Sequence, residues 1–174
     1  MVNNTIISNS CCVEIGETLI LDDVSFSINK NSLIAVVGPN GGGKTTLFNA
    51  ITGLIPITKG SIEINGQDVT KGNGNIGYVP QNENLNWNFP LTARQVVGLG
   101  ITKNFPSIPF ISKNKNNLIE ECLNDVGLYD QIDNRVDEMS GGQKQRVLLA
   151  KILAQGANIL LLDEAFSGVD IGSQ

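Results

Sequence analysis

The sequence predicts an α/β protein, in which a mostly parallel sheet flanked by helices carries an antiparallel β subdomain and a helical insertion. One observation is an apolar, β-branched run at residues 33–37, which leads through a glycine-rich loop into a helix-like segment. Another is a set of short runs on both sides of that loop in which apolar and polar residues alternate, as in half-buried strands. The third is a polar stretch with apolar residues at helical spacing. We therefore predict a single domain, with a core at 1–82 and 136–174 and a helical subdomain at 83–135.

Composition narrows the class of protein. The 174 residues carry a net charge of −5, which argues against nucleic acid as the main partner. The chain has no apolar run of the length that crosses a bilayer and no signal-peptide pattern at its start, so we expect a cytoplasmic protein. It has no histidine, which excludes His-ligated metal sites and Ser-His-Asp or Cys-His catalysis within the chain. Cys11, Cys12 and Cys122 lack metal-type spacing and are interpreted as thiols of a reducing compartment.

One segment fits the phosphate-loop pattern G-x-x-x-x-G-K-[ST] at every fixed position. Its residues are Gly38, Pro39, Asn40, Gly41, Gly42, Gly43, Lys44, Thr45 and Thr46. Residues 33–37 predict a buried strand before the loop, and residues 46–52 predict a helix after it that ends at Gly53. A strand, a glycine-rich loop and a helix in this order form the setting in which the pattern binds phosphate. The alternative is a glycine-rich loop that binds nothing.

The chemistry of this loop is that of a P-loop NTPase. Glycines allow consecutive backbone N–H groups to turn toward one anion, and the helix that follows adds unpaired N–H groups and its positive dipole end. Lys44 would reach the β- and γ-phosphates, and the Thr45 hydroxyl would ligate Mg²⁺. We therefore predict that the chain binds a nucleoside triphosphate.

The remaining strands are short. Residues 5–8 and 24–28 predict neighbouring strands of an antiparallel sheet, and residues 60–66 predict another strand closed by an Asn-Gly turn. Residues 72–77 match G-x-G-x-x-G, but we reject a dinucleotide site because the match neither follows a strand nor opens a helix. Residues 76–81 predict a short strand that ends at a proline.

The polar stretch contains two predicted helices. Residues 92–95 form a capping box that opens a helix running to Gly98 or Gly100. Residues 118–126 predict a second helix that ends at Gly127. We interpret this stretch as an insertion between the two halves of the nucleotide-binding core.

Two further segments carry candidate site residues. Ser140 is a natural N-cap for a helix through residue 154, and the paired glycines beside it make a second potential anion site, or an ordinary capped helix. An apolar strand at residues 158–162 ends in Asp163 and Glu164. Ligands of open parallel sheets lie beyond the carboxyl ends of the strands, so Asp163 would hold Mg²⁺ opposite Thr45. Glu164 would orient or deprotonate a water; the alternative is a pair of solvated acids.

The order of these motifs resembles the ATP-binding subunit of an ABC transporter. The resemblance extends over nearly the whole chain. It comprises Walker A at 38–46, the Q-loop Gln81, the signature Ser140, Gly141, Gly142 and Gln143, Walker B at 159–163, Glu164, and a D-loop at 167–170.

The resemblance implies a composite site. In this family two subunits sandwich two ATP molecules head to tail, so the signature of one would bind the γ-phosphate held by the other. Gln81 would ligate Mg²⁺, take part in catalysis and couple the site to a transmembrane permease. The subunit would lie on the cytoplasmic face of the plasma membrane, and a substrate-binding protein would take part indirectly. ATP closure and hydrolysis would drive alternating access.

A narrower resemblance concerns residues 86–92 and 164–170, which are similar to the manganese, zinc and iron-chelate branch of importers. The alternative is a generic ABC importer subunit. In either case other subunits select the cargo.

The chain also departs from the family pattern. An aromatic residue that stacks on adenine is usual before Walker A, and Ile15 stands near that position. Met139 replaces the signature's leading leucine, a volume-conserving change. The chain stops four residues after Asp170, before the family's switch histidine and final strands. We therefore expect a truncated subunit that binds ATP but hydrolyses it poorly.

Two rival functions remain at this point. One is a soluble ABC protein acting on ribosomes or DNA, for which the sequence shows no tandem cassette and no basic cluster. The other is a truncated, non-catalytic nucleotide-binding module that only regulates.

Overall fold

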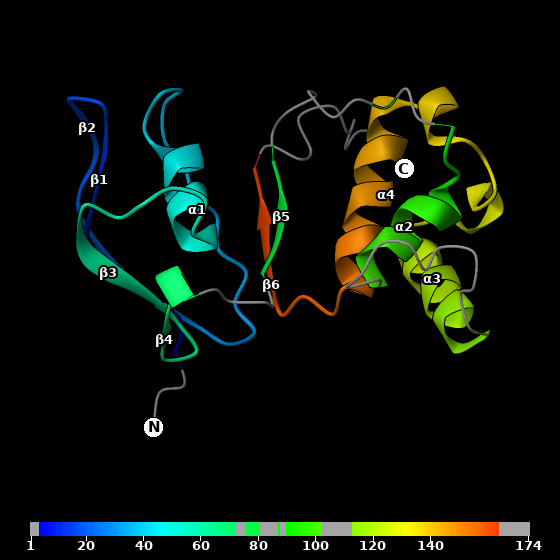
Figure 1. The fold of residues 1–174 in the computed structure, drawn as a ribbon, viewed down its shortest axis with the longest axis horizontal. Helices are drawn as coiled ribbons and strands as arrows, with labels where there is room; N and C mark the ends of the chain where they lie inside the picture. Colours follow the sequence, from blue (N-terminus) through cyan, green and yellow to red (C-terminus); the bar gives the residue numbers. More distant parts are fainter. Residues whose placement is uncertain (1–3, 72–75, 81–86, 88–89, 102–112, 164–174) are drawn as a thin grey trace. The chain divides into compact units, whose positions relative to one another are not determined.

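The computed structural model describes residues 4–71, 76–80, 87, 90–101 and 113–163 (Figure 1). The chain forms two compact units, residues 1–74 and residues 75–174, and each is described here by itself. The predicted division at 82/83 and 135/136 into core and helical subdomain stays a prediction.

The first unit contains a four-stranded antiparallel sheet in the order β2-β1-β3-β4 (Figure 1). The strands are β1 (Asn4–Ile15), β2 (Thr18–Asn29), β3 (Lys59–Ile64) and β4 (Gln67–Asp68). The predicted antiparallel pairing is confirmed, and β1 and β2 extend well beyond the predicted 5–8 and 24–28. Alternation places Ile62 and Ile64 of β3 in the buried core of this unit.

A tight turn joins β3 to β4, as the sequence predicts. Asn65 and Gly66 have φ of 51° and 77°, so both turn residues are left-handed. This is the backbone of a hairpin turn whose twist matches that of the strands, and asparagine followed by glycine is the pair that adopts it most readily. A short 3₁₀ helix, η1 (Val69–Lys71), follows.

The predicted buried strand at residues 33–37 is wrong. These residues are irregular, and their side chains are exposed, with Leu33 at 100% and Val37 at 87% of full exposure. Apolar, β-branched composition favours a strand but cannot supply a hydrogen-bonded neighbour. In the described part of the chain, no strand of either sheet pairs with this segment.

The second unit contains two parallel strands, β5 (Ile76–Val79) and β6 (Ile159–Leu162), which lie side by side in Figure 1. Their register runs from Ile76 opposite Ile159 to Val79 opposite Leu162. The predicted strand at 158–162 is thus confirmed, and its parallel partner is the strand predicted at 76–81. Residues 80–158 separate the two strands along the chain, and these residues hold the helices.

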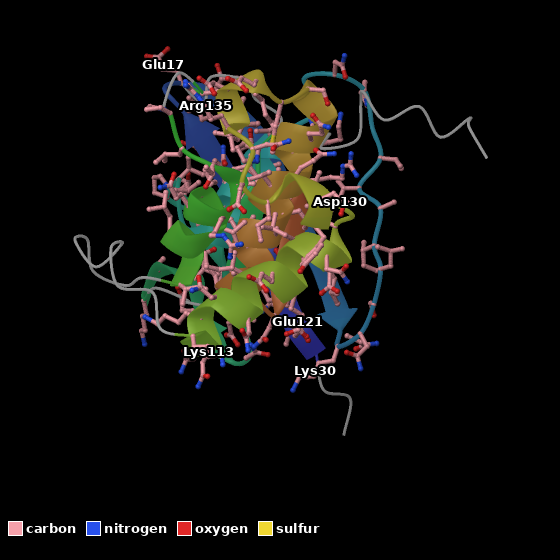
Figure 2. All side chains as sticks on the ribbon, turned by 90° about the vertical axis from the view of Figure 1, so that its right-hand side faces the viewer. Glu17, Lys30, Lys113, Glu121, Asp130 and Arg135 are labelled. Atoms are coloured by element: carbon pink, nitrogen blue, oxygen red, sulfur yellow. The ribbon has the colours of Figure 1, made fainter. Side chains whose placement is uncertain are left out.

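Three helices form the largest cluster of the second unit: α2 (Ala93–Ile101), α3 (Lys113–Asp125) and α4 (Gly141–Ala154) (Figure 1). Two 3₁₀ helices, η2 (Tyr129–Gln131) and η3 (Val136–Glu138), connect α3 to α4. Their shared apolar core includes fully buried side chains from all three helices, namely Val97, Ile119, Leu123 and Val147. By contrast, Lys113 and Glu121 of α3 and Asp130 of η2 are exposed (Figure 2). The two helices of the predicted insertion thus share this core with α4, which lies outside the predicted bounds of the insertion.

The start of α2 confirms the predicted capping box, and its end corrects the prediction. The Thr92 N–H donates to Gln95 Oε1 at 2.9 Å, and the Gln95 N–H donates to Thr92 Oγ1 at 3.3 Å. The helix does not end at Gly98 or Gly100 but continues to Ile101. A Cβ at Gly100 would collide with the Lys151 carbonyl oxygen, so glycine here permits close packing of α2 on α4. This packing compensates for the low helix propensity of glycine.

Helix α4 also packs on the two-stranded sheet. Val79 of β5 and Ile152 of α4 are buried together, with Leu148, Ala157 and Leu162 around them. A Cβ on Gly77 would lie far inside van der Waals distance of Ile152 Cγ2. Glycine at position 77 therefore lets α4 approach β5 closely. No helix among the described residues is long and apolar enough to cross a membrane.

The first prediction concerns this close approach. Gly77→Ala should destabilise the chain by about 1–3 kcal/mol, because the new methyl group overpacks the contact with Ile152. Urea unfolding would measure the loss. In the double variant Gly77→Ala/Ile152→Ala the two costs should not add, since removing Cγ2 makes room for the methyl group. Simple additivity would show that the two residues are not in contact.

Candidate functional site

The phosphate-loop motif at 38–46 comprises a glycine-rich loop and the first residues of α1 (Lys44–Thr52). The helix begins two residues earlier than predicted and ends, as predicted, before Gly53. Gly41 and Gly43 have φ of 79° and 81°, and Gly42 between them donates its N–H to the Pro39 carbonyl at 3.1 Å. Residues of opposite hand in succession turn their N–H groups toward a common side and form an anion-binding concavity. The loop therefore has the backbone that a phosphate site requires.

Gly43 has a second reason to be glycine. It is the N-cap of α1, and a Cβ there would lie 2.9 Å from Leu21 Cδ2 and 3.3 Å from the Ile20 carbonyl oxygen. The end of the loop is thus pressed against β2. This contact fixes the position at which α1 begins, and with it the direction of the helix N-terminus.

Lys44 closes the loop. Its Nζ donates to the Gly38 carbonyl at 2.9 Å and to the Pro39 carbonyl at 2.8 Å, so the ammonium group lies over the loop that precedes it. A lysine can make three such bonds and its charge makes each of them stronger than a neutral one. The only cation of the motif is therefore held against the carbonyl groups at the start of the loop. Thr45, the predicted Mg²⁺ ligand, is exposed on the first turn of α1.

The signature segment forms the second predicted anion site. Ser140 is the N-cap of α4 and forms a complete capping box with Gln143 at the start of the helix. The Gln143 N–H donates to Ser140 Oγ at 3.3 Å, and the Ser140 N–H donates to Gln143 Oε1 at 2.8 Å. The predicted N-cap is confirmed. Gln143, predicted to bind nucleotide, also has a structural role because its side chain stabilises the start of its own helix.

Gly141 and Gly142 occupy the first turn of α4, and no contact among the described residues requires glycine at either position. A Cβ at either position would meet no described heavy atom within 4 Å, and neither residue has a left-handed φ. Glycine in a helix costs up to about 1 kcal/mol relative to alanine. Within the described part of the chain, no atom therefore blocks close approach of another molecule to these two residues.

Lys144, one residue after the signature, connects three segments. Its Nζ lies 5.9 Å from the centroid of the Trp87 ring and donates to the Asp137 carbonyl at 3.3 Å. Trp87 in turn packs against the helical cluster. A cation over an aromatic face is an attractive contact. Lys144 therefore ties the start of α4 to η3 and to the segment before α2.

The predicted metal ligand Asp163 stands at the carboxyl end of β6 and is only 4% exposed. Its backbone N–H donates to the Val79 carbonyl at 3.0 Å, which continues the pairing of β5 with β6 by one step. Its carboxylate accepts a hydrogen bond at Oδ2 from the Tyr78 hydroxyl, at 3.3 Å. A carboxylate is a hard oxygen donor of the kind Mg²⁺ prefers, so the residue fits its predicted role.

Tyr78 is held in its protonated form. Burial, and then the negative charge of Asp163, raise the pKa of Tyr78 to about 12. At neutral pH the phenol therefore keeps its proton, and it is the donor in the bond to Asp163.

The predicted site residues fall in different places. The loop at 38–46 and Thr45 belong to the first unit, whereas the signature and Asp163 belong to the second. The pairing of Thr45 with Asp163 about one Mg²⁺ stays a prediction. Gln81, Glu164 and the D-loop at 167–170 lie outside the described residues. Ile15, near the expected adenine position, is an exposed residue at the end of β1.

Tyr78 and Lys144 belong to none of the sequence motifs. Tyr78 lies inside the strand predicted at 76–81, and its relation to Asp163 follows only from the register of β5 and β6. Lys144 could have been identified as the first cation after the N-cap of α4. Its contact with Trp87, however, joins positions 57 residues apart, and no local pattern reports it.

The loop closed by its own lysine defines the chain as a phosphate-loop protein of the α/β class. Comparison identifies the family. Residues 21–167 match the family described as "ABC transporter", and the chain belongs to that family.

The relatives are longer than this chain. It is 37% identical over 155 residues to the manganese transport system ATP-binding protein MntB of Bacillus subtilis, an alignment that covers 89% of this chain and 62% of that protein. It is 40% identical over 163 residues to the chelated iron transport system membrane protein YfeB of Yersinia pestis, with 91% of this chain and 54% of that protein covered. The chain thus spans less than two thirds of these relatives.

A solved structure supports the fold. A nucleotide-free ATP-binding cassette from an ABC transporter superposes with a TM-score of 0.81 at 24% identity, covering 95% of this chain and 71% of the other. The predicted fold class, a P-loop NTPase core with an antiparallel β subdomain and helices, is confirmed by this likeness.

The second prediction tests the contact between Lys144 and Trp87. Trp87 is the only tryptophan in the sequence, so its fluorescence reports one position. Lys144→Gln should shift the emission to longer wavelength, because the ring loses its cation and the covering side chain, and should cost about 0.5–1 kcal/mol of stability. Lys144→Arg, which keeps the cation, should leave both close to the parent. Unchanged emission in the glutamine variant would contradict the contact.

Proposed function

We propose that this chain is part of the ATP-binding subunit of an ABC importer for divalent metal ions, such as manganese or zinc, or for iron chelates. The observation that carries the proposal is the glycine loop at 38–46, in which two glycines are left-handed and Lys44 folds back onto the Gly38 and Pro39 carbonyls. Relatives whose names refer to manganese and chelated iron transport support the class of cargo. Other subunits would select the cargo.

In the proposed site ATP binds with its phosphates in the loop. Lys44 would exchange its bonds to two loop carbonyls for bonds to the β- and γ-phosphates, which are stronger because both partners are charged. Thr45, Asp163 and Gln81 would hold Mg²⁺ on the phosphate oxygens. Glu164 would orient the attacking water for hydrolysis.

The signature segment would complete the site of a second subunit in a head-to-tail ATP sandwich. The open surface above Gly141 and Gly142 supports this role, because a phosphate can reach the N–H groups of the first turn of α4 only where side chains leave room. The dimer would bind transmembrane permease subunits at the cytoplasmic face of the plasma membrane, and a substrate-binding protein would act indirectly. Weak hydrolysis by these 174 residues alone stays a prediction.

The third prediction tests ATP binding. Lys44→Ala should weaken binding of Mg-ATP by roughly 10- to 100-fold, because a charge-assisted hydrogen bond contributes about 1.5–3 kcal/mol. Isothermal titration calorimetry would measure the change. Lys30→Ala, at an exposed lysine of the same unit, is the matched control and should bind like the parent (Figure 2). Equal affinity of the Lys44 variant and the parent would contradict the proposed site.

The fourth prediction separates the cap of α4 from its role toward a partner. Aspartate is as good an N-cap as serine, so Ser140→Asp should keep the helix intact, but its charge would repel a phosphate. In a Glu164→Gln background, light scattering should show an ATP-dependent dimer that Ser140→Asp abolishes. Thr92→Asp, in the other capping box of this unit, is the control and should still dimerise.

Urea unfolding completes this test. Ser140→Ala should lose about 1 kcal/mol of stability with the cap, whereas Ser140→Asp should lose much less. An ATP-dependent dimer of Ser140→Asp equal to that of the parent would show that Ser140 does not face phosphate.

A further inference from the structure

The phenol of Tyr78 and the carboxylate of Asp163 lie on one face of the two-stranded sheet. In the parallel register Tyr78 is opposite Leu161, and side chains alternate between the two faces of a strand. Asp163, two residues after Leu161, therefore shares the face of Tyr78. The Tyr78 hydroxyl donates to Asp163 Oδ2 at 3.3 Å along this diagonal.

The opposite face of the same strands is packed against a helix. Gly77 is in close contact with Ile152 of α4, and Val79 is buried with it. The backbone bond from Asp163 to Val79 continues the pairing beyond the end of β6. The packing against α4 and the pairing of β5 with β6 therefore hold Tyr78 and Asp163 in fixed positions relative to each other.

The chemistry of the pair suits a metal ligand and its supporting donor. A carboxylate has about four lone-pair positions on two oxygens, so a hydrogen bond at Oδ2 is compatible with coordination of a metal by the same group. At 3.3 Å the bond is longer than the usual O–H···O distance of about 2.5–3.0 Å, and its donor contacts one of the two carboxylate oxygens. Residues that hydrogen-bond to metal-ligating carboxylates orient them, and their loss typically costs about 10- to 100-fold in metal affinity or activity.

We propose that Tyr78 is a positioning residue, which orients the Asp163 carboxylate toward the Mg²⁺ that accompanies ATP. This inference rests on the proposed function, because it concerns the metal of that same site. It assigns Tyr78 a role in metal affinity rather than in contacts with the nucleotide.

The test compares two tyrosine-to-phenylalanine variants of the full chain. The sequence has two tyrosines, and the other, Tyr129, is exposed in η2, so Tyr129→Phe is a matched control. ATP affinity is measured in EDTA and in Mg²⁺, and bound Mn²⁺ is counted by electron paramagnetic resonance as a probe of the same site. Tyr78→Phe should bind metal-free ATP like the parent but show about a tenfold weaker affinity for Mn²⁺ in the presence of ATP. Tyr129→Phe should match the parent in both.

Three results would overturn the inference. The first is a Tyr78→Phe chain with the metal affinity of the parent. The second is a variant that loses metal-free and metal-dependent ATP binding equally, since this would indicate a purely structural role. The third is a parent chain that binds no ATP in either condition, which would also overturn the proposed function, whereas the first two leave that function intact.

A spectroscopic readout covers the case in which Tyr78→Phe does not fold. In the Tyr129→Phe chain Tyr78 is the only tyrosine. Adding Mg²⁺ to its ATP complex should change the ultraviolet difference spectrum of that tyrosine, because the metal withdraws charge from the carboxylate that the phenol contacts. Absence of a metal-induced tyrosine signal would overturn the inference.

Discussion

The close packing of α4 on β5, which Gly77 permits, is the contact on which the second unit depends. The helix runs for about 20 Å at 1.5 Å per residue, from the capped signature at its start to Ile152 near its end. Through Val147 and Ala150 the helix is part of the helical core, and through Ile152 it covers the sheet that ends in Asp163. One rigid element therefore sets the distance between the signature and the buried carboxylate.

The two candidate anion sites are built by different local devices. At the loop before α1, left-handed glycines and the folded-back Lys44 prepare the backbone, and contact with β2 fixes the start of the helix. At the start of α4 a reciprocal capping box does the same without any cation directly in the cap. The first site carries its own positive charge and suits a phosphate held by the subunit itself. The second has no such charge in its cap, which agrees with the proposal that its phosphate is supplied from outside.

Much of the fold could be predicted from the sequence because its devices are local. The capping box at Thr92, the N-cap at Ser140 and the Asn65–Gly66 turn depend on residues no more than three apart, and all three form as predicted. The prediction of a strand at 33–37 was wrong, because a strand forms only where a neighbouring strand pairs with it and the local sequence does not show whether such a partner exists. The predicted end of α2 was wrong for a related reason. At Gly100 the packing against α4 outweighs the local tendency of glycine to end a helix.

The candidate site shows the same division between local and distant contacts. The loop lysine, the N-cap serine and the aspartate at the strand end were identified because each sits beside the pattern that defines it. Tyr78 was not, because its contact with Asp163 depends on a register between strands far apart in the chain.

Two groups of glycines in this chain differ in whether a Cβ would meet a neighbouring atom, and this difference bears on whether the glycine serves folding or binding. Gly43, Gly77 and Gly100 lie where a Cβ would strike a neighbouring residue, so the fold itself requires them. Gly141 and Gly142 have no such neighbour among the described residues, yet they stand in a helix, where glycine is costly. The helix stability lost at these two glycines is not compensated by any contact among the described residues. A second molecule that occupies the space above them would explain why glycine stands there. These two glycines therefore support the proposal that the first turn of α4 binds a phosphate held by a second subunit.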